Sequence, residues 1–102
     1  MIVGEQMIEW MKDMWSYPRS LTGHGTRQTL EYLKNINPDL HIHSYKSGTK
    51  VFDWEIPDEW NIYDAYIEHE SGLRFAEFSA NNLHVLGYSI PCDMDISLPE
   101  LL

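Results

Sequence analysis

The chain has 102 residues, which suits one domain or a piece of a larger protein, and its 43% apolar and 13% aromatic shares exclude wholesale disorder. Sixteen acidic residues against seven basic ones give a net charge of −9, which excludes a typical nucleic-acid binder, because such proteins neutralise phosphates with Lys and Arg. No apolar run approaches the ~18 residues of a membrane span, so we expect no membrane partner.

Apolar residues near the N-terminus recur at the spacing of one helical face. This face consists of Met7, Ile8, Met11, Met14 and Trp15. The pattern predicts a first helix over about residues 4 to 15. Pro18 prevents its continuation, because proline lacks an amide hydrogen and pushes the preceding residue away from helical geometry.

A second helix is predicted from near His24 to Ile36, before Pro38. Thr22 or Thr26 is expected to cap its first turn, and the pattern does not choose between them. The two glycines of "TGHG" are expected to let the backbone turn sharply and approach whatever packs against the helix start.

From Leu40 the period changes from 3.6 to 2, which is typical of strands. "HIHSYKS" and "KVFDWEI" are interpreted as strands, and "DAYIEHESGLRFAEF" as a hairpin that turns at Glu70-Ser71-Gly72. "NNLHVLGYSI" is interpreted as a final strand. The predicted fold class is α+β: two N-terminal helices followed by a β-rich region of four to six mostly antiparallel strands.

The last residues, "SLPELL", have the features of a helix start. Ser97 is the expected N-cap, with Glu100 at capping-box spacing and Pro99 in the first turn. A six-residue helix is unstable alone, so we expect the chain to be a fragment of a longer polypeptide; a frayed natural tail is the alternative.

One weak binding site is predicted at the start of the second helix. Arg19, Thr22, Gly23 and Arg27 surround helix amides that favour negative charge, so a substrate group or an anion could bind there. A purely structural turn between the helices is the simpler interpretation. A second weak site is an aromatic cluster of Trp54, Trp60 and Tyr66, which could stack on a sugar or a peptide or could simply fill a small core.

Other candidate chemistry has weaker support. His41 and His43 share one face of a predicted strand, but two ligands without a third do not make a zinc site. Cys92 is the single cysteine, so no internal disulfide can form, and it lacks a setting that would lower its pKa. We therefore expect no catalytic residue, metal or cofactor in this chain. The lone thiol and the absence of a signal-peptide pattern predict a cytoplasmic location.

Three strings, "RSLTGHGTRQTLEYLK", "SGTKVFDWEIPDEWNIYDAYI" and "NNLHVLGYSIP", together resemble the N-terminal part of a bacterial and archaeal family of aminopeptidase-like proteins. Members are often encoded among surface-polysaccharide genes. The resemblance implies a longer zinc-exopeptidase-like α/β protein with a small inserted β-rich domain. Residues 1–47 would then be the first helices and strand of the peptidase-like domain, and residues 48–102 the start of the insert.

By the same resemblance, the zinc ligands of the parent protein would lie outside this segment. The implied function is a non-catalytic segment of a zinc-dependent metallopeptidase, acting as scaffold and possible wall of the substrate cleft. The alternative is a β-rich module that binds a carbohydrate or a protein. The expected partner is the remainder of its own polypeptide; exposed helix faces also make a homodimer plausible.

Overall fold

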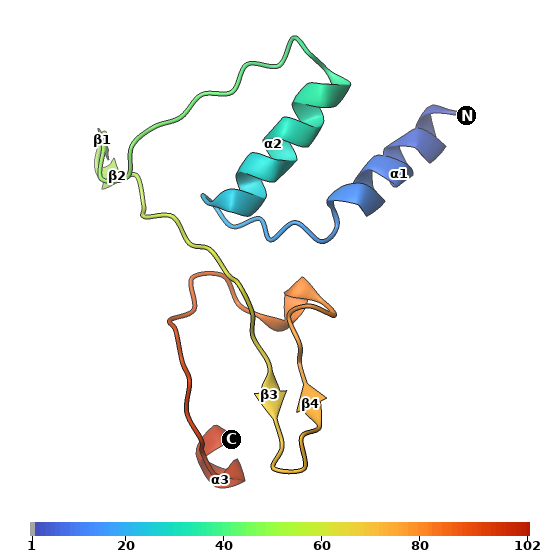
Figure 1. Cartoon of the computed structure of the whole chain (residues 1–102). Coiled ribbons are helices and arrows are strands. Elements are labelled where there is room, and N and C mark those ends of the chain that lie inside the picture. The colour runs from blue at the N-terminus through green and yellow to red at the C-terminus, as the bar shows by residue number, and fades with distance from the viewer. Residues whose placement is uncertain (1) are drawn as a thin grey trace.

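The computed structural model describes residues 2–102 as a chain of short elements in an open arrangement (Figure 1). The helices are α1 (Val3–Met14), α2 (His24–Ile36), the 3-10 helix η1 (Asn82–His84) and α3 (Leu98–Leu101). The strands are β1 (Lys50–Val51), β2 (Trp54–Glu55), β3 (Ile67–Glu68) and β4 (Arg74–Phe75). This composition confirms the predicted α+β class.

The two predicted N-terminal helices are present, and α2 has the predicted bounds. The prediction that Thr22 or Thr26 caps α2 is wrong. Gly23 is the N-cap residue and has no side chain to offer, so the His24 amide instead donates to Oδ1 of Asn61, at 2.8 Å. The helix start is thus capped from a segment far away in the sequence.

"KVFDWEI" does not form one strand as predicted. Phe52 has a φ of +53°, which turns the chain back, so that β1 and β2 form a tight antiparallel hairpin with Lys50 opposite Glu55. The Lys50 ammonium lies 2.8 Å from a Glu55 carboxylate oxygen across this hairpin. The alternating apolar pattern therefore spans a turn, which period-2 reasoning cannot detect.

The second predicted hairpin is confirmed. β3 and β4 pair antiparallel, with Ile67 opposite Phe75 and Glu68 opposite Arg74. The turn between them includes Gly72, whose φ of +88° is a conformation that side chains disfavour. A Glu68–Arg74 ion pair with an N–O distance of 3.2 Å links the two strands.

Two further predicted strands are not formed among the described residues. "HIHSYKS" runs from α2 to β1 without strand pairing among the described residues (Figure 1). "NNLHVLGYSI" begins with η1 instead, because Asn81 Oδ1 accepts a hydrogen bond from the Leu83 amide and so starts a helical turn. At the other end, the predicted capping box of α3 is confirmed: the Ser97 amide donates to Glu100 Oε2 at 2.8 Å.

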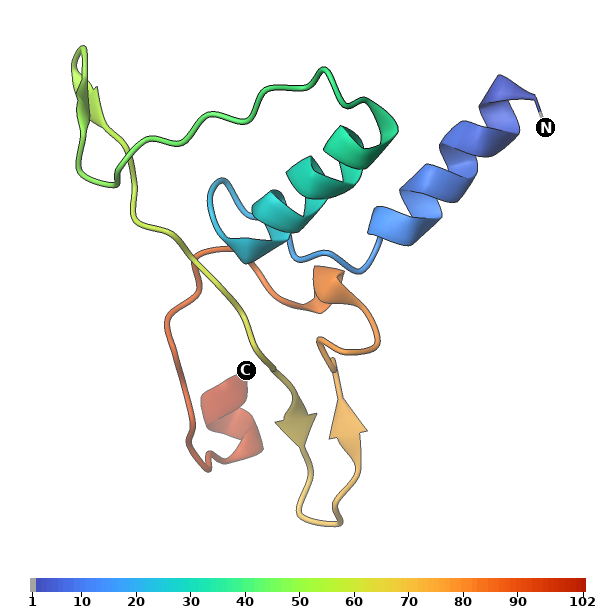
Figure 2. The same ribbon diagram turned by 45° about the horizontal axis from the view of Figure 1, so that its top comes forward.

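The described chain has no hydrophobic core. None of its hydrophobic side chains is buried, and the two buried residues are Gly23 and Gly25. The radius of gyration is 18.0 Å, whereas a compact domain of this length would have about 13 Å. The two hairpins lie apart in both ribbon views (Figures 1 and 2), so the β-rich part consists of two separate two-stranded pieces.

This absence of a core predicts that the isolated 102-residue chain does not unfold cooperatively. A compact domain of about 100 residues absorbs about 60–80 kcal/mol at its melting midpoint. Differential scanning calorimetry of the isolated chain should show no such peak, because there is little apolar burial to lose. A sharp two-state transition with an enthalpy in that range would contradict the prediction.

Candidate functional site

Segments that are far apart in the sequence meet at the loop before α2. We call this meeting point the glycine junction: residues 20–25 together with residues 58–61 and 88–89. The Trp60 amide donates to the Thr22 carbonyl at 3.2 Å. The Thr22 hydroxyl in turn lies 3.4 Å from the Asp58 carbonyl, to which it donates. These contacts, with the Asn61 cap, fix the 58–61 segment against the start of α2.

The glycines of "TGHG" are required by close backbone approach. A Cβ on Gly25 would lie 2.1 Å from the Pro18 carbonyl oxygen, closer than any real contact. A Cβ on Gly23 would lie 2.6 Å from the Trp60 carbonyl oxygen, and Gly23 also has a φ of +151°. The sequence-based expectation of a sharp turn with a close neighbour is therefore correct.

Trp60 extends the junction to the third segment. Its ring stacks on Tyr88, with centroids 6.1 Å apart and planes inclined by 26°. Its indole Nε1 donates to the Ser89 carbonyl at 2.9 Å. The Tyr88 hydroxyl donates to the Asp58 carbonyl at 3.2 Å and also lies 3.3 Å from the Thr22 hydroxyl. The junction thus contains aromatic stacking as well as hydrogen bonds.

Of the predicted anion site, Thr22 and Gly23 belong to the junction, and the side chains of Arg19 and Arg27 each have protein partners. Arg27 pairs with Glu59 and lies 3.3 Å from Nδ1 of His24. Arg19 donates to the Met14 carbonyl at 3.0 Å. An anion would therefore have to displace internal partners, and its binding stays a prediction.

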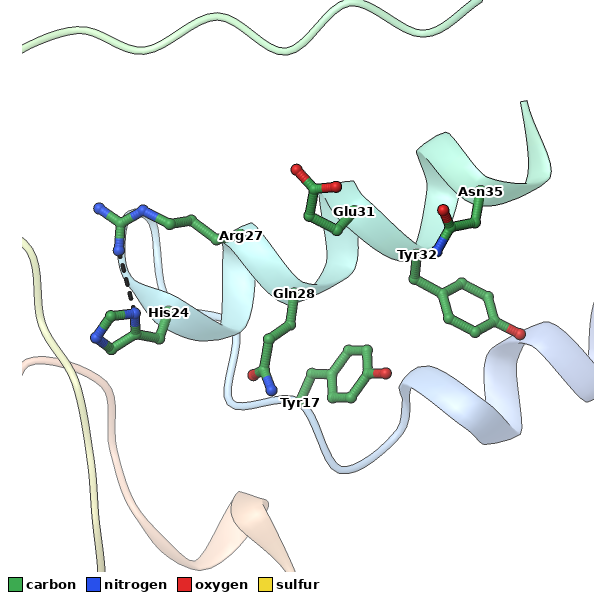
Figure 3. Close-up of a pocket in the computed structure, with 7 residues that line it drawn as sticks. All are labelled: Tyr17, His24, Arg27, Gln28, Glu31, Tyr32 and Asn35. Carbon is green, nitrogen blue, oxygen red and sulfur yellow. Dashed lines mark hydrogen bonds between the residues drawn. The ribbon is translucent and has the colours of Figure 1, made fainter. Parts of the chain in front are cut away.

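A polar groove of about 540 Å³ lies beside the junction, on the surface of α2 (Figure 3). Tyr17 and Tyr32 lie on the side of α2 that faces α1, whereas Arg27 and Glu31 rise from the other side. The lining residues are Tyr17, His24, Arg27, Gln28, Glu31, Tyr32 and Asn35. Planar amides beside two aromatic rings could hold a polar ligand, and the groove is wide open to solvent.

Tyr32 connects the two long helices in this groove. Its hydroxyl donates to a carboxylate oxygen of Asp13 in α1. This hydrogen bond, together with the nearby negative charge, raises the pKa of Tyr32 to about 12, because the neutral phenol is the form that donates. The pair is a direct side-chain link between α1 and α2.

The predicted aromatic cluster does not come together. Trp54 lies on the β1–β2 hairpin and is 56% exposed, while Trp60 is engaged with Tyr88 at the junction. Tyr66 lies beside the other hairpin, where the Arg74 guanidinium carbon sits 3.9 Å from its ring centroid. Each ring thus has its own surroundings, and a ligand spanning all three rings would need a rearrangement.

The described residues do not form a zinc site. No group of three or more His, Cys, Asp or Glu side chains within residues 2–102 could hold a metal ion. His41 and His43 lie on the unpaired segment after α2, and Cys92 is exposed. The zinc implied by the resemblance therefore does not fit this segment. In the same range, no helix is long and apolar enough to span a bilayer.

Sequence reasoning missed the partners that complete the junction. Asn61, Glu59 and Tyr88 carry no local pattern that would reveal them, because these contacts join residues 28 or more positions apart in the chain. The sequence pattern predicts Trp60 as a ligand-binding ring, whereas the structure places it in the junction. Only the glycines, with their narrow steric role, provided a usable signal.

Comparison with known proteins identifies the class of this molecule. Residues 8–93 match the family described as Domain of unknown function (DUF4910), so the chain belongs to that family. It is 43% identical over 98 residues to a Clostridium acetobutylicum protein named "Putative polysaccharide biosynthesis protein with aminopeptidase-like domain". That match covers 96% of this chain and 22% of the relative.

A solved structure gives the same result. The crystal structure of a "putative peptidase" from Clostridium acetobutylicum superposes with a TM-score of 0.92 at 43% identity, over 96% of this chain and 23% of that one. The chain therefore corresponds to a small part of a larger homologous polypeptide. Its open, coreless shape is the shape of that part within the larger protein. The resemblance inferred from the three sequence strings is confirmed.

The steric role of Gly25 can be tested in a chimera, in which this chain replaces the matching residues of the Clostridium acetobutylicum relative. We expect Gly25→Ala to destabilise the chimera by about 2–4 kcal/mol, because backbone must move to admit the methyl group. Gly87→Ala is the matched control, since a Cβ there meets nothing within 4 Å. Urea unfolding measures both, and equal stability of the two variants would refute the steric argument.

The Tyr32–Asp13 link predicts a pH effect. A phenol whose pKa is raised from 10.0 to about 12 stabilises the folded state fully below pH 10, and this contribution is lost as pH rises through about 12. NMR titration of labelled tyrosine in the chimera should assign the high pKa to Tyr32, with Tyr32→Phe removing that resonance. Asp13→Asn should move the Tyr32 pKa toward its ordinary value; an unchanged titration would show that the link is absent.

Proposed function

We propose that this chain is a non-catalytic segment of a zinc-dependent aminopeptidase-like hydrolase, where it acts as scaffold and forms part of the wall of the substrate cleft. The observation that carries the proposal is the combination of a missing core with a close structural match. The chain buries none of its hydrophobic side chains, yet it has the fold of a small part of a larger peptidase-like protein.

The exposed apolar side chains support the scaffold role. The predicted inner face of α1 is uncovered: Met7 is 53% exposed, Met11 65% and Trp15 59%. Large exposed apolar patches mark interaction surfaces, and burying such a face removes about 25 cal/mol of unfavourable hydration free energy for each Å². We infer that the remainder of the polypeptide packs on this face, in preference to a second copy.

The side chains present determine which roles we assign to this chain and which to the rest of the parent protein. When bound, zinc in such hydrolases would activate water for attack on an amide, and its ligands would come from outside this segment. The residues of this chain would hold neighbouring parts of the substrate cleft in position. The polar groove beside α2 is the part that we assign to the cleft wall, because its amides and phenols could hydrogen-bond a peptide-like substrate. We also propose that residues 1–47 belong to the peptidase-like domain and residues 48–102 to its β-rich insert.

The scaffold role can be tested by complementation. The relative is prepared without the residues that match this chain, and the 102-residue chain is then added back or fused in their place. We expect hydrolysis of aminoacyl p-nitroanilides to be absent from either part alone, restored by the combination, and abolished by 1,10-phenanthroline. Zinc measured by mass spectrometry should be stoichiometric in the combination and absent from the isolated chain.

Matched variants make the test specific. Fusion of the Gly25→Ala chain should restore less activity than fusion of the Gly87→Ala chain, since only the first disturbs the glycine junction. Full activity of the relative without its matching residues would reject the scaffold role. Activity that survives the chelator would reject zinc dependence but leave the scaffold role standing.

A further inference from the structure

The segment between α2 and β1 has an unusual backbone. Residues 41–45 run as an extended trace in both ribbon views (Figures 1 and 2). Within residues 2–102, none of their amide or carbonyl groups makes a hydrogen bond. Pairing resumes on either side, where the Leu40 amide donates to Asn37 at 3.0 Å and the Lys46 carbonyl accepts from Thr49 at 3.2 Å.

The side chains of this segment have the pattern of a strand. Leu40, Ile42 and Ser44 alternate with His41, His43 and Tyr45, and no glycine or proline interrupts the run. Ile42 is 37% exposed, against 74% for Tyr45. A run of five or six residues is also the usual length of a strand.

This extended path is also the path within the larger protein. The match to the solved relative has a TM-score of 0.92 and covers 96% of this chain. Backbone amides and carbonyls that become buried in a larger protein need hydrogen-bond partners, and an extended segment obtains them from a neighbouring strand. The described residues supply no such neighbour, so it has to come from elsewhere.

We propose that residues 41–45 form a β-strand whose partner strand lies in the part of the parent polypeptide outside this segment. The inference rests on the scaffold role proposed above, and it identifies the strand through which this chain would bind the rest of the polypeptide. A strand from the same polypeptide is favoured over a second copy because this chain matches only 22% of its relative, and because copies carrying a net charge of −9 each repel one another.

Amide hydrogen exchange is the direct test. In the chimera, at least every second amide among residues 41–45 should exchange at least about 100-fold more slowly than in the isolated chain. The reason is that ladder hydrogen bonds protect these amides. Mass spectrometry with electron-transfer fragmentation gives the residue resolution. Exchange at the rate of an unstructured peptide in a chimera that is otherwise folded would overturn the proposal.

Neighbouring proline variants provide a second measurement. Ile42→Pro and His43→Pro each remove one amide donor, and these donors point to opposite edges of a strand. We expect at least one of them to lower the melting temperature of the chimera well beyond its control, Ile42→Ala or His43→Ala. Proline variants as stable as both alanine controls would refute the pairing.

Two measurements distinguish this proposal from pairing with a second copy and from the proposed zinc-dependent function. Protection that appears only in a dimer, and is lost on dilution to monomer, would identify a second copy as the partner and overturn the proposal. Protection in a chimera without chelator-sensitive peptidase activity would support the strand while rejecting the zinc-dependent function. The two ideas can therefore fail independently.

Discussion

The fold depends on a close approach between backbones at the start of α2. Gly23 lies against the Trp60 carbonyl and Gly25 against the Pro18 carbonyl, at distances that leave no room for a methyl group. This approach places Asn61 over the first amide of α2 and brings Trp60 onto Tyr88. Since hydrophobic burial contributes little here, steric fit and hydrogen bonds at this junction set the position of α2 relative to the segments around Trp60 and Tyr88.

The parts of this fold that could be predicted from the sequence are those with local causes. The bounds of α2, the hairpin around Gly72 and the capping box of α3 each follow from residues within a few positions of one another. The predictions that failed depend on contacts between distant residues or on a turn hidden within an alternating pattern. Phe52 adopts a left-handed turn inside an alternating pattern, and the cap of α2 comes from Asn61.

The candidate site shows the same division. The steric need for the glycines could be inferred from "TGHG", but their neighbours could not. The predicted anion site includes Arg19 and Arg27, but their protein partners Met14 and Glu59 could not be inferred from the sequence. Apolar periodicity identified the inner face of α1, but it could not reveal that this face is uncovered among the described residues.

The thinness of the chain affects how its sequence can change. The shortest extent is 18 Å, less than two helix diameters of about 10–12 Å. Nearly every side chain therefore reaches one face or the other, and few of them pack mainly against side chains of the same segment. We therefore expect a substitution in this thin layer to disturb mainly the contacts with the parts of the larger protein that cover it.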